Sequence, residues 1–219
     1  MALNKLKYNS LNVTPVANKA ISFDSDPDAL EATLSGGAMT FIKKLTASSS
    51  GTLSFVDGSS DVVLDNTYKE YIFLFKDIHP ATDDANFLFN MSADTGSNYN
   101  VTKTSTFFRL YHQEDASQQG VSYYANGDLA QSTGTQLLSY GCGSDNDQCT
   151  TGFLHLFNPS STTFVKHFIG RTNTYESTNN SWGGFLAGYA NTTSAVDAVQ
   201  FKMSSGNIDA GTITLYGIN

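Results

Sequence analysis

Four histidines are the side chains in this 219-residue chain best suited to proton transfer at neutral pH. Each lies in or beside a segment expected to be a strand, with apolar neighbours, and a histidine in that setting is usually structural. They are His79, His112, His155 and His167. A serine hydrolase would also need a strained nucleophile turn, and the sequence contains no Gly-x-Ser-x-Gly motif. The histidines therefore predict no catalytic base.

The carboxylates give no glycosidase pattern, which requires two acids facing each other across a cleft. Most aspartates fall in expected turns, where Asp is favoured because its side chain hydrogen-bonds the local backbone. The glutamates in strand-like contexts are Glu70, Glu114 and Glu176, and no spacing pairs them. The sequence thus predicts no catalytic residue and a protein that is not an enzyme.

Metal and cofactor sites are not expected either. Asp24-x-Asp26-x-Asp28 resembles the start of a calcium loop, but Ala29 stands at the sixth position, which requires Gly. Cys142 and Cys149 bracket one loop, and two thiols cannot complete a tetrahedral zinc site. Two interpretations of the cysteines fit equally well, a local disulfide and two unpaired thiols.

Three aromatic residues lie among Asn, Ser and Gly rather than in apolar runs: Tyr175, Trp182 and Tyr189. Sugars stack their apolar faces on such rings, so these residues form a candidate glycan-binding platform. A tryptophan that anchors a turn, or an interface contact, also fits this pattern.

Most of the chain reads as short runs of period two that end in Gly, Asn, Ser or Asp, the pattern of β-strands and turns. We expect an all-β fold, an antiparallel β-sandwich that is jelly-roll-like. The expected strands are 39–45, 52–56, 71–78, 87–91, 104–113, 152–157, 162–169, 185–189, 196–203 and 212–218. Residues 71–78 and 152–157 are apolar on both faces, which indicates either a partner on the second face or a helix or loop across it.

The first 37 residues differ from the rest. Residues 26–34 fit a short helix with Asp26 as N-cap and Pro27 in the first turn. The alternatives are an ordered arm that docks on another surface and a first strand packed on the sandwich. The expected division is an N-terminal docking segment, 1–37, and a β-sandwich domain, 38–219.

Composition limits the partners. The net charge is −8 and the 12 Lys and Arg are scattered, so the basic face that nucleic acid requires is not expected. No stretch approaches the roughly 20 apolar residues of a membrane helix. The first residues carry no apolar run behind their lysines, so we expect synthesis in the cytosol.

The C-terminal segment reads Phe201-Lys-Met-Ser-Ser-Gly-Asn-Ile-Asp-Ala-Gly-Thr-Ile-Thr-Leu-Tyr-Gly-Ile218. It resembles the ending F-x-x-S-x-G-x-I-x-x-G-x-x-x-L-Y-G-I of a family of small virion proteins of marine phages, such as those of cyanobacteria. Residues 6–15, 54–58 and 158–168 are also similar to that family. The residues themselves indicate a hairpin in which Phe201 and Leu215 face inward and Gly206 and Gly211 form a turn and a bulge.

The resemblance implies a structural component of a phage particle exterior, a capsid decoration or a tail or fibre protein. Its expected partners are further copies of itself, as a homotrimer, and other head or tail proteins. A carbohydrate-binding module or adhesin for host-surface glycans is the alternative, and a hydrolase of host polysaccharide is a third. The resemblance carries no active-site residue, and the expected location is the virion.

Overall fold

The computed structural model describes residues 20–23, 30–33 and 38–218, and the chain divides into two compact units, Met1–Ala38 and Met39–Asn219. In the first unit, β1 (Ala20–Phe23) pairs with β2 (Leu30–Thr33) in antiparallel register, with Ala20 opposite Thr33. The helix expected over 26–34 is therefore wrong at residues 30–33, while 26–29 and 34 lie outside the described residues. A nine-residue helix is marginal by itself, and a cross-strand ladder satisfies the same backbone groups.

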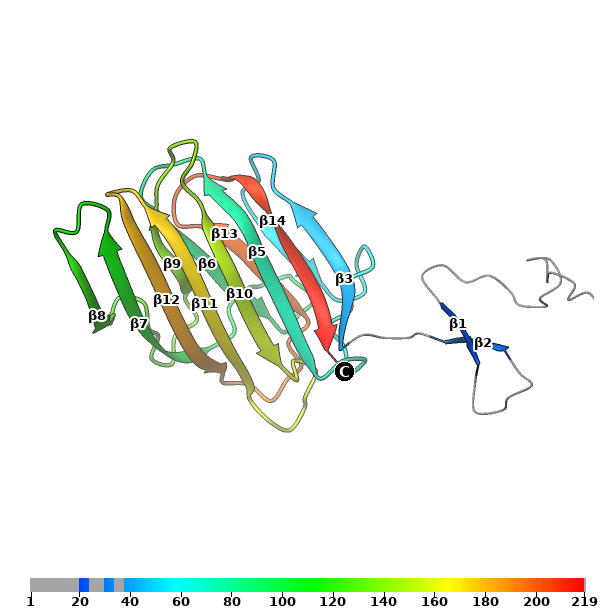
Figure 1. Cartoon of the computed structure of the whole chain (residues 1–219). Coiled ribbons are helices and arrows are strands. Elements are labelled where there is room, and N and C mark those ends of the chain that lie inside the picture. The colour runs from blue at the N-terminus through cyan, green and yellow to red at the C-terminus, as the bar shows by residue number, and fades with distance from the viewer. Residues whose placement is uncertain (1–19, 24–29, 34–37, 219) are drawn as a thin grey trace, which may run out of the picture. The chain divides into compact units, whose positions relative to one another are not determined.

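The second unit is one antiparallel sheet of twelve strands, and no helix occurs in the part of the chain that the structure describes. The prediction of an all-β antiparallel fold is confirmed. Eight strands lie side by side and form what we call the main layer (Figure 1): β3 (Met39–Thr46), β14 (Ile208–Ile218), β5 (Glu70–Pro80), β10 (Thr150–Phe157), β11 (Lys166–Glu176), β12 (Asn180–Ala190), β7 (Lys103–Gln113) and β8 (Gln119–Tyr123).

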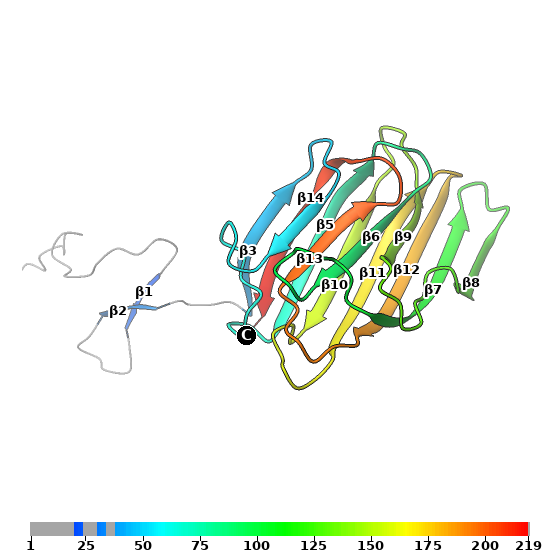
Figure 2. The same ribbon diagram turned by 180° about the vertical axis from the view of Figure 1, so that it is seen from behind.

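Four strands lie behind the main layer and form the return layer, which faces the viewer in Figure 2. They are β9 (Gln136–Cys142), β6 (Ala85–Ser92), β13 (Ala198–Met203) and β4 (Leu53–Val56). The two layers meet where β9 pairs with β11 at Cys142 and Glu176. From that junction β12, β7 and β8 continue the main layer in the other direction.

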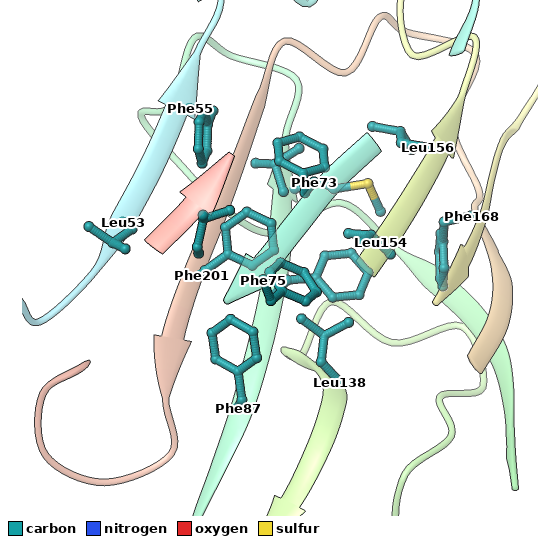
Figure 3. Close-up of a cluster of buried hydrophobic side chains, with 14 of the residues drawn as sticks. Leu53, Phe55, Phe73, Phe75, Phe87, Leu138, Leu154, Leu156, Phe168 and Phe201 are labelled. Carbon is teal, nitrogen blue, oxygen red and sulfur yellow. The ribbon is translucent and has the colours of Figure 1, made fainter. Parts of the chain in front are cut away.

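The core lies between the layers and is rich in phenylalanine. Phe201 of β13 is fully buried, and its ring centroid lies 5.3 Å from those of Phe73 and Phe75 on β5 and 5.9 Å from that of Phe87 on β6. Figure 3 shows these rings together, with leucines of β9 and β10 beside them. Successive side chains of a strand point to opposite faces, so every second residue of each strand lies on this inner side. The apolar residues that recur at every second position therefore meet in one core.

Strict alternation along the expected strand 71–78 would put Ile78 on the side opposite Tyr71, Phe73 and Phe75, yet Ile78 is fully buried with them. Asp77 adopts a positive φ of 52°, and the β5–β10 register shifts beside it, so one extra residue turns Ile78 inward.

The C-terminal segment also differs from the hairpin that the sequence predicts. Phe201 and Leu215 are buried as expected, and Gly206 and Gly211 have φ of 68° and 110°. However, β13 pairs with β4 and β6 in the return layer, while β14 pairs with β3 and β5 in the main layer. The segment between them therefore crosses from one layer to the other, and the two strands do not form a hairpin.

Candidate functional site

The outer face of the main layer, the face turned away from the return layer, carries a continuous line of large side chains. Backbone pairing places one residue of each strand directly opposite the next. We call this line the aromatic row; from β5 to β8 it consists of Leu74, Phe153, Arg171, Phe185, Phe108 and Tyr123. Directly opposed side chains on one sheet face lie close enough to contact each other, so the row forms one surface.

Several of these side chains are open to solvent although they are apolar. Phe108 is 43% exposed and Tyr123 59%, and Val121 beside them on β8 is 73% exposed. The one charge in the row, Arg171, holds its guanidinium 4.8 Å from the Phe185 ring centroid. This cation–π arrangement keeps the charge on an aromatic surface instead of interrupting it.

A second line of side chains runs parallel to the aromatic row, two residues along each strand. Tyr216, Ile72, His155 and Ile169 follow each other across β14, β5, β10 and β11. Ile169 is exposed, while the His155 ring stacks on Phe157 at 4.0 Å between centroids and has its Nε2 3.0 Å from a Glu70 carboxylate oxygen. The strands that were expected to be apolar on both faces thus present their second face to solvent.

Two open depressions hollow this face on either side of Phe185. One, of about 290 Å³, lies between Leu110, Phe153 and Gly183, and the other, of about 400 Å³, lies between Ile169, Ala187 and Tyr189. They form because β12 carries Gly183 and Ala187 where its outer face would otherwise hold larger side chains. Shallow apolar hollows between aromatic rings are suited to receive side chains of a partner surface.

The three residues expected to form a glycan platform do not come together. Tyr175 and Tyr189 belong to the outward-facing positions of β11 and β12, whereas Trp182 points inward and is only 2% exposed. Trp182 packs against Phe107 and Tyr140, with ring centroids at 5.7 and 5.8 Å. The predicted platform of Tyr175, Trp182 and Tyr189 is therefore wrong, because the Trp182 side chain lies on the inner face of β12.

The two cysteines are free thiols in the structure, so of the two interpretations the local disulfide is not formed. Cys142 is fully buried, and desolvation raises its pKa to about 11. Cys149 is half-buried, and desolvation raises its pKa as well. Because the thiolate is the reactive form, neither environment activates a nucleophile.

The histidines and acids are dispersed. His79 lies near Asp209, His155 near Glu70, and His112 and His167 are exposed on the outer face. Within residues 20–23, 30–33 and 38–218, no three His, Cys, Asp or Glu side chains converge as metal ligands would. Asp24, Asp26 and Asp28 lie outside the described residues.

Sequence reasoning missed two buried lysines. Lys103 and Lys166 point inward on either side of Ala190, to which both are paired in register, and both are fully buried. The Lys103 ammonium donates to Asn90 Oδ1 and to the Val101 carbonyl, and burial lowers its pKa to about 8. The Lys166 ammonium donates to the carbonyls of Phe164 and Thr192. The sequence contained a signal for this burial, since each lysine lies an even number of residues from buried residues of its own strand.

No family model, no curated protein and no solved structure matches the chain.

The described residues include no helix long and apolar enough to cross a membrane.

Proposed function

We propose that this chain is a structural protein of a phage particle exterior, a capsid decoration or a tail or fibre component. It assembles with further copies of itself through the outer face of its main layer. The observation that carries the proposal is the aromatic row, which crosses six neighbouring strands with one charge, Arg171, stacked on a ring.

The exposure of the row supports an assembly role. Burying apolar surface stabilises an interface by roughly 25 cal/mol per Å², and large exposed apolar patches on a soluble domain usually mark an interaction site. Phe108, Tyr123 and Val121 are the most exposed apolar side chains at the β7–β8 end of this face. Few charges need to be desolvated when two such faces meet, because charged residues make up only 15% of the chain.

The resemblance of Phe201–Ile218 to the ending of marine-phage virion proteins supports the placement on a phage particle. In this proposal the chain is made in the host cytoplasm, forms a homotrimer and binds other head or tail proteins. A jelly-roll-like sandwich is the proposed fold type, supported by two antiparallel layers that enclose one core. The role is to hold and cover, and no reaction is assigned.

Light scattering coupled to size exclusion tests the self-assembly. The full chain is expected to run as a discrete oligomer, and Phe108→Ser, in the middle of the exposed end of the row, is expected to shift it to the monomer. Phe164→Ser is the matched control, because Phe164 is 69% exposed but lies in the loop before β11, outside the row. A wild-type chain that is monomeric at all concentrations contradicts the proposal, as does a Phe108→Ser chain that assembles normally.

Cryo-electron microscopy of the intact phage particle tests the location. Density for the main layer is expected on the particle surface, with the aromatic row covered by a neighbouring copy. A particle whose density contains no copy of the chain removes the virion assignment while leaving the self-assembly result intact.

A further inference from the structure

A small pocket opens on the inner side of the main layer, between side chains of β7 and β12. These strands and β8 form one end of that layer (Figure 1). Its volume is about 140 Å³, and it is lined mainly by Arg109, Tyr111, Tyr140, Glu176, Asn180 and Trp182. Arg109 and Tyr111 alternate along β7 with Phe108 and Leu110, so this pocket and the aromatic row lie on opposite faces of the same strands. We call it the Trp182 pocket.

Aromatic rings form much of the wall of the Trp182 pocket. Tyr111 is directly opposite Trp182 in the β7–β12 register, and the Tyr140 ring is tilted by 33° to Trp182 with centroids 5.8 Å apart. Behind them lies Tyr124, whose ring centroid is 5.5 Å from that of Tyr140 and 6.0 Å from that of Trp182. Such rings offer flat apolar faces to a ligand that presents C–H groups.

A buried donor in this wall has no protein partner. Trp182 is 2% exposed, and its indole Nε1–H is buried without a hydrogen-bond acceptor among residues 38–218. An unsatisfied buried polar group costs about 1–3 kcal/mol, so such a group requires a physical explanation. A ligand oxygen in the pocket would satisfy it.

A buried acceptor lies two residues away on the same face of β12. The Asn180 side-chain amide donates from Nδ2 to Glu176 Oε2 at 3.0 Å and to Thr178 Oγ1 at 2.9 Å. Because Nδ2 has two hydrogens and both are used, the orientation of the amide is fixed. Asn180 Oδ1 is thereby left buried and without a donor among the described residues.

The lining of the pocket carries one positively charged side chain, Arg109, and one negatively charged side chain, Glu176. The Arg109 guanidinium lies 5.2 and 4.8 Å from the ring centroids of Tyr111 and Tyr124. Glu176 Oε2 accepts hydrogen bonds from the Thr178 amide and hydroxyl as well as from Asn180. One cation and one anion in the lining favour a ligand without net charge.

From these features we infer that the Trp182 pocket binds a neutral, hydroxyl-rich ring, one residue of a saccharide. A hydroxyl both accepts and donates, so it can satisfy Trp182 Nε1–H and Asn180 Oδ1, while C–H groups of the ring pack against Tyr140. A cavity of about 150 Å³ holds a benzene ring, so the Trp182 pocket of about 140 Å³ has room for the six-membered ring of one sugar residue, whose outer hydroxyl groups would extend towards the open mouth. The site is separate from the aromatic row and does not depend on the proposed assembly.

Trp182 is the one tryptophan of the chain, so its fluorescence reports on this pocket without labelling. The full chain is titrated with glucose, galactose, mannose and N-acetylglucosamine, each up to tens of millimolar. At least one sugar is expected to change the emission saturably, with a dissociation constant of about 1 mM, typical of a few hydrogen bonds and one stacked ring. Absence of any response across the four sugars, confirmed by saturation-transfer NMR, overturns the inference.

Paired variants locate the binding. Asn180→Ala removes the buried acceptor and is expected to weaken binding about tenfold. Asn173→Ala makes the same change on the outer face, where Asn173 donates to Ser181 Oγ, and is expected to bind as the wild type does. Equal affinity of the two variants would place the sugar elsewhere and overturn the assignment.

A second variant guards against a folding defect in Asn180→Ala. Trp182→Phe keeps an aromatic ring in the wall but lacks the N–H donor, and saturation-transfer NMR replaces fluorescence as its readout. Its sugar signal is expected to fall while its thermal unfolding stays cooperative. A folded Trp182→Phe protein with an undiminished sugar signal contradicts the role given to Nε1–H.

Discussion

Phe108 and Phe185 stack face to face on the outer face of the main layer, with ring centroids 4.6 Å apart and planes inclined by 6°. They come from β7 and β12, which pair along eleven residues each, so the stack is held by a full ladder of backbone hydrogen bonds. The pair is therefore pre-arranged on the sheet before any partner arrives, and little side-chain entropy is lost when a second surface covers it.

The chemistry of this face predicts how assembly depends on salt. An interface built from the aromatic row buries apolar surface, which sodium chloride does not screen, whereas an interface held by exposed ion pairs weakens as salt rises. The oligomer is expected to persist from low salt to about 1 M sodium chloride and to be strengthened by sodium sulfate. Sedimentation velocity measures this, and dissociation at high sodium chloride would indicate an electrostatic contact instead.

The position of Phe201 predicts a large loss of stability on truncation. Its ring contacts Phe55, Phe73 and Phe87 from three other strands, so Phe201→Ala leaves a cavity that both layers would have to fill. We expect the free energy of unfolding to fall by about 3–5 kcal/mol. Urea denaturation measures the change, and Phe164→Ala, at a 69% exposed ring, is expected to alter stability by about 0.5 kcal/mol or less.

The burial of Lys103 predicts a rise of stability with pH. Its folded-state pKa is about 8, below the ordinary value of 10.5, so between these values the unfolded chain binds more protons than the folded chain. Stability contributed by this group therefore increases as pH rises from about 8 towards 10, by at most about 3 kcal/mol.

The measurement for Lys103 is a comparison with Lys103→Met by urea denaturation at several pH values. The wild type is expected to gain stability relative to the variant across this window. Taking the difference removes the opposite contribution of Cys142, whose raised pKa favours the unfolded chain as pH increases above 9. Parallel curves for the two proteins would show that Lys103 is not held in a desolvated site.

The unequal burial of the two thiols predicts unequal reactivity. Cys149 is half-buried, whereas Cys142 is fully buried with a pKa near 11 and remains protonated at pH 8. Ellman's reagent at pH 8 is expected to label one thiol of the native protein, that of Cys149, and both thiols in urea. Cys149→Ser should abolish the labelling of the native protein, and a wild-type protein with no titratable thiol even in urea would show that the disulfide forms.

Most of the strands could be predicted because side-chain direction in a strand is a local property. Phe107 is buried and its neighbour Phe108 exposed, so the two lie on opposite faces as alternation over 104–113 predicts. Strand β9, with Leu137 and Leu138 adjacent, and the largely exposed β8 were missed, since neither shows a clean alternation. The second half of β11, which alternates through Thr172 and Thr174, was missed because its inward residues are polar.

The spacing of apolar residues is enough to predict an antiparallel β protein with phenylalanine inside and a second apolar face on β5 and β10. It does not predict that β13 and β14 lie in different layers, that Ile78 turns inward, or that Trp182 lines an inner pocket with Asn180. Alternation states only which side of a strand a residue faces. Which strand becomes its neighbour depends on contacts between residues far apart in the chain, and these arise only when the layers close on a common core.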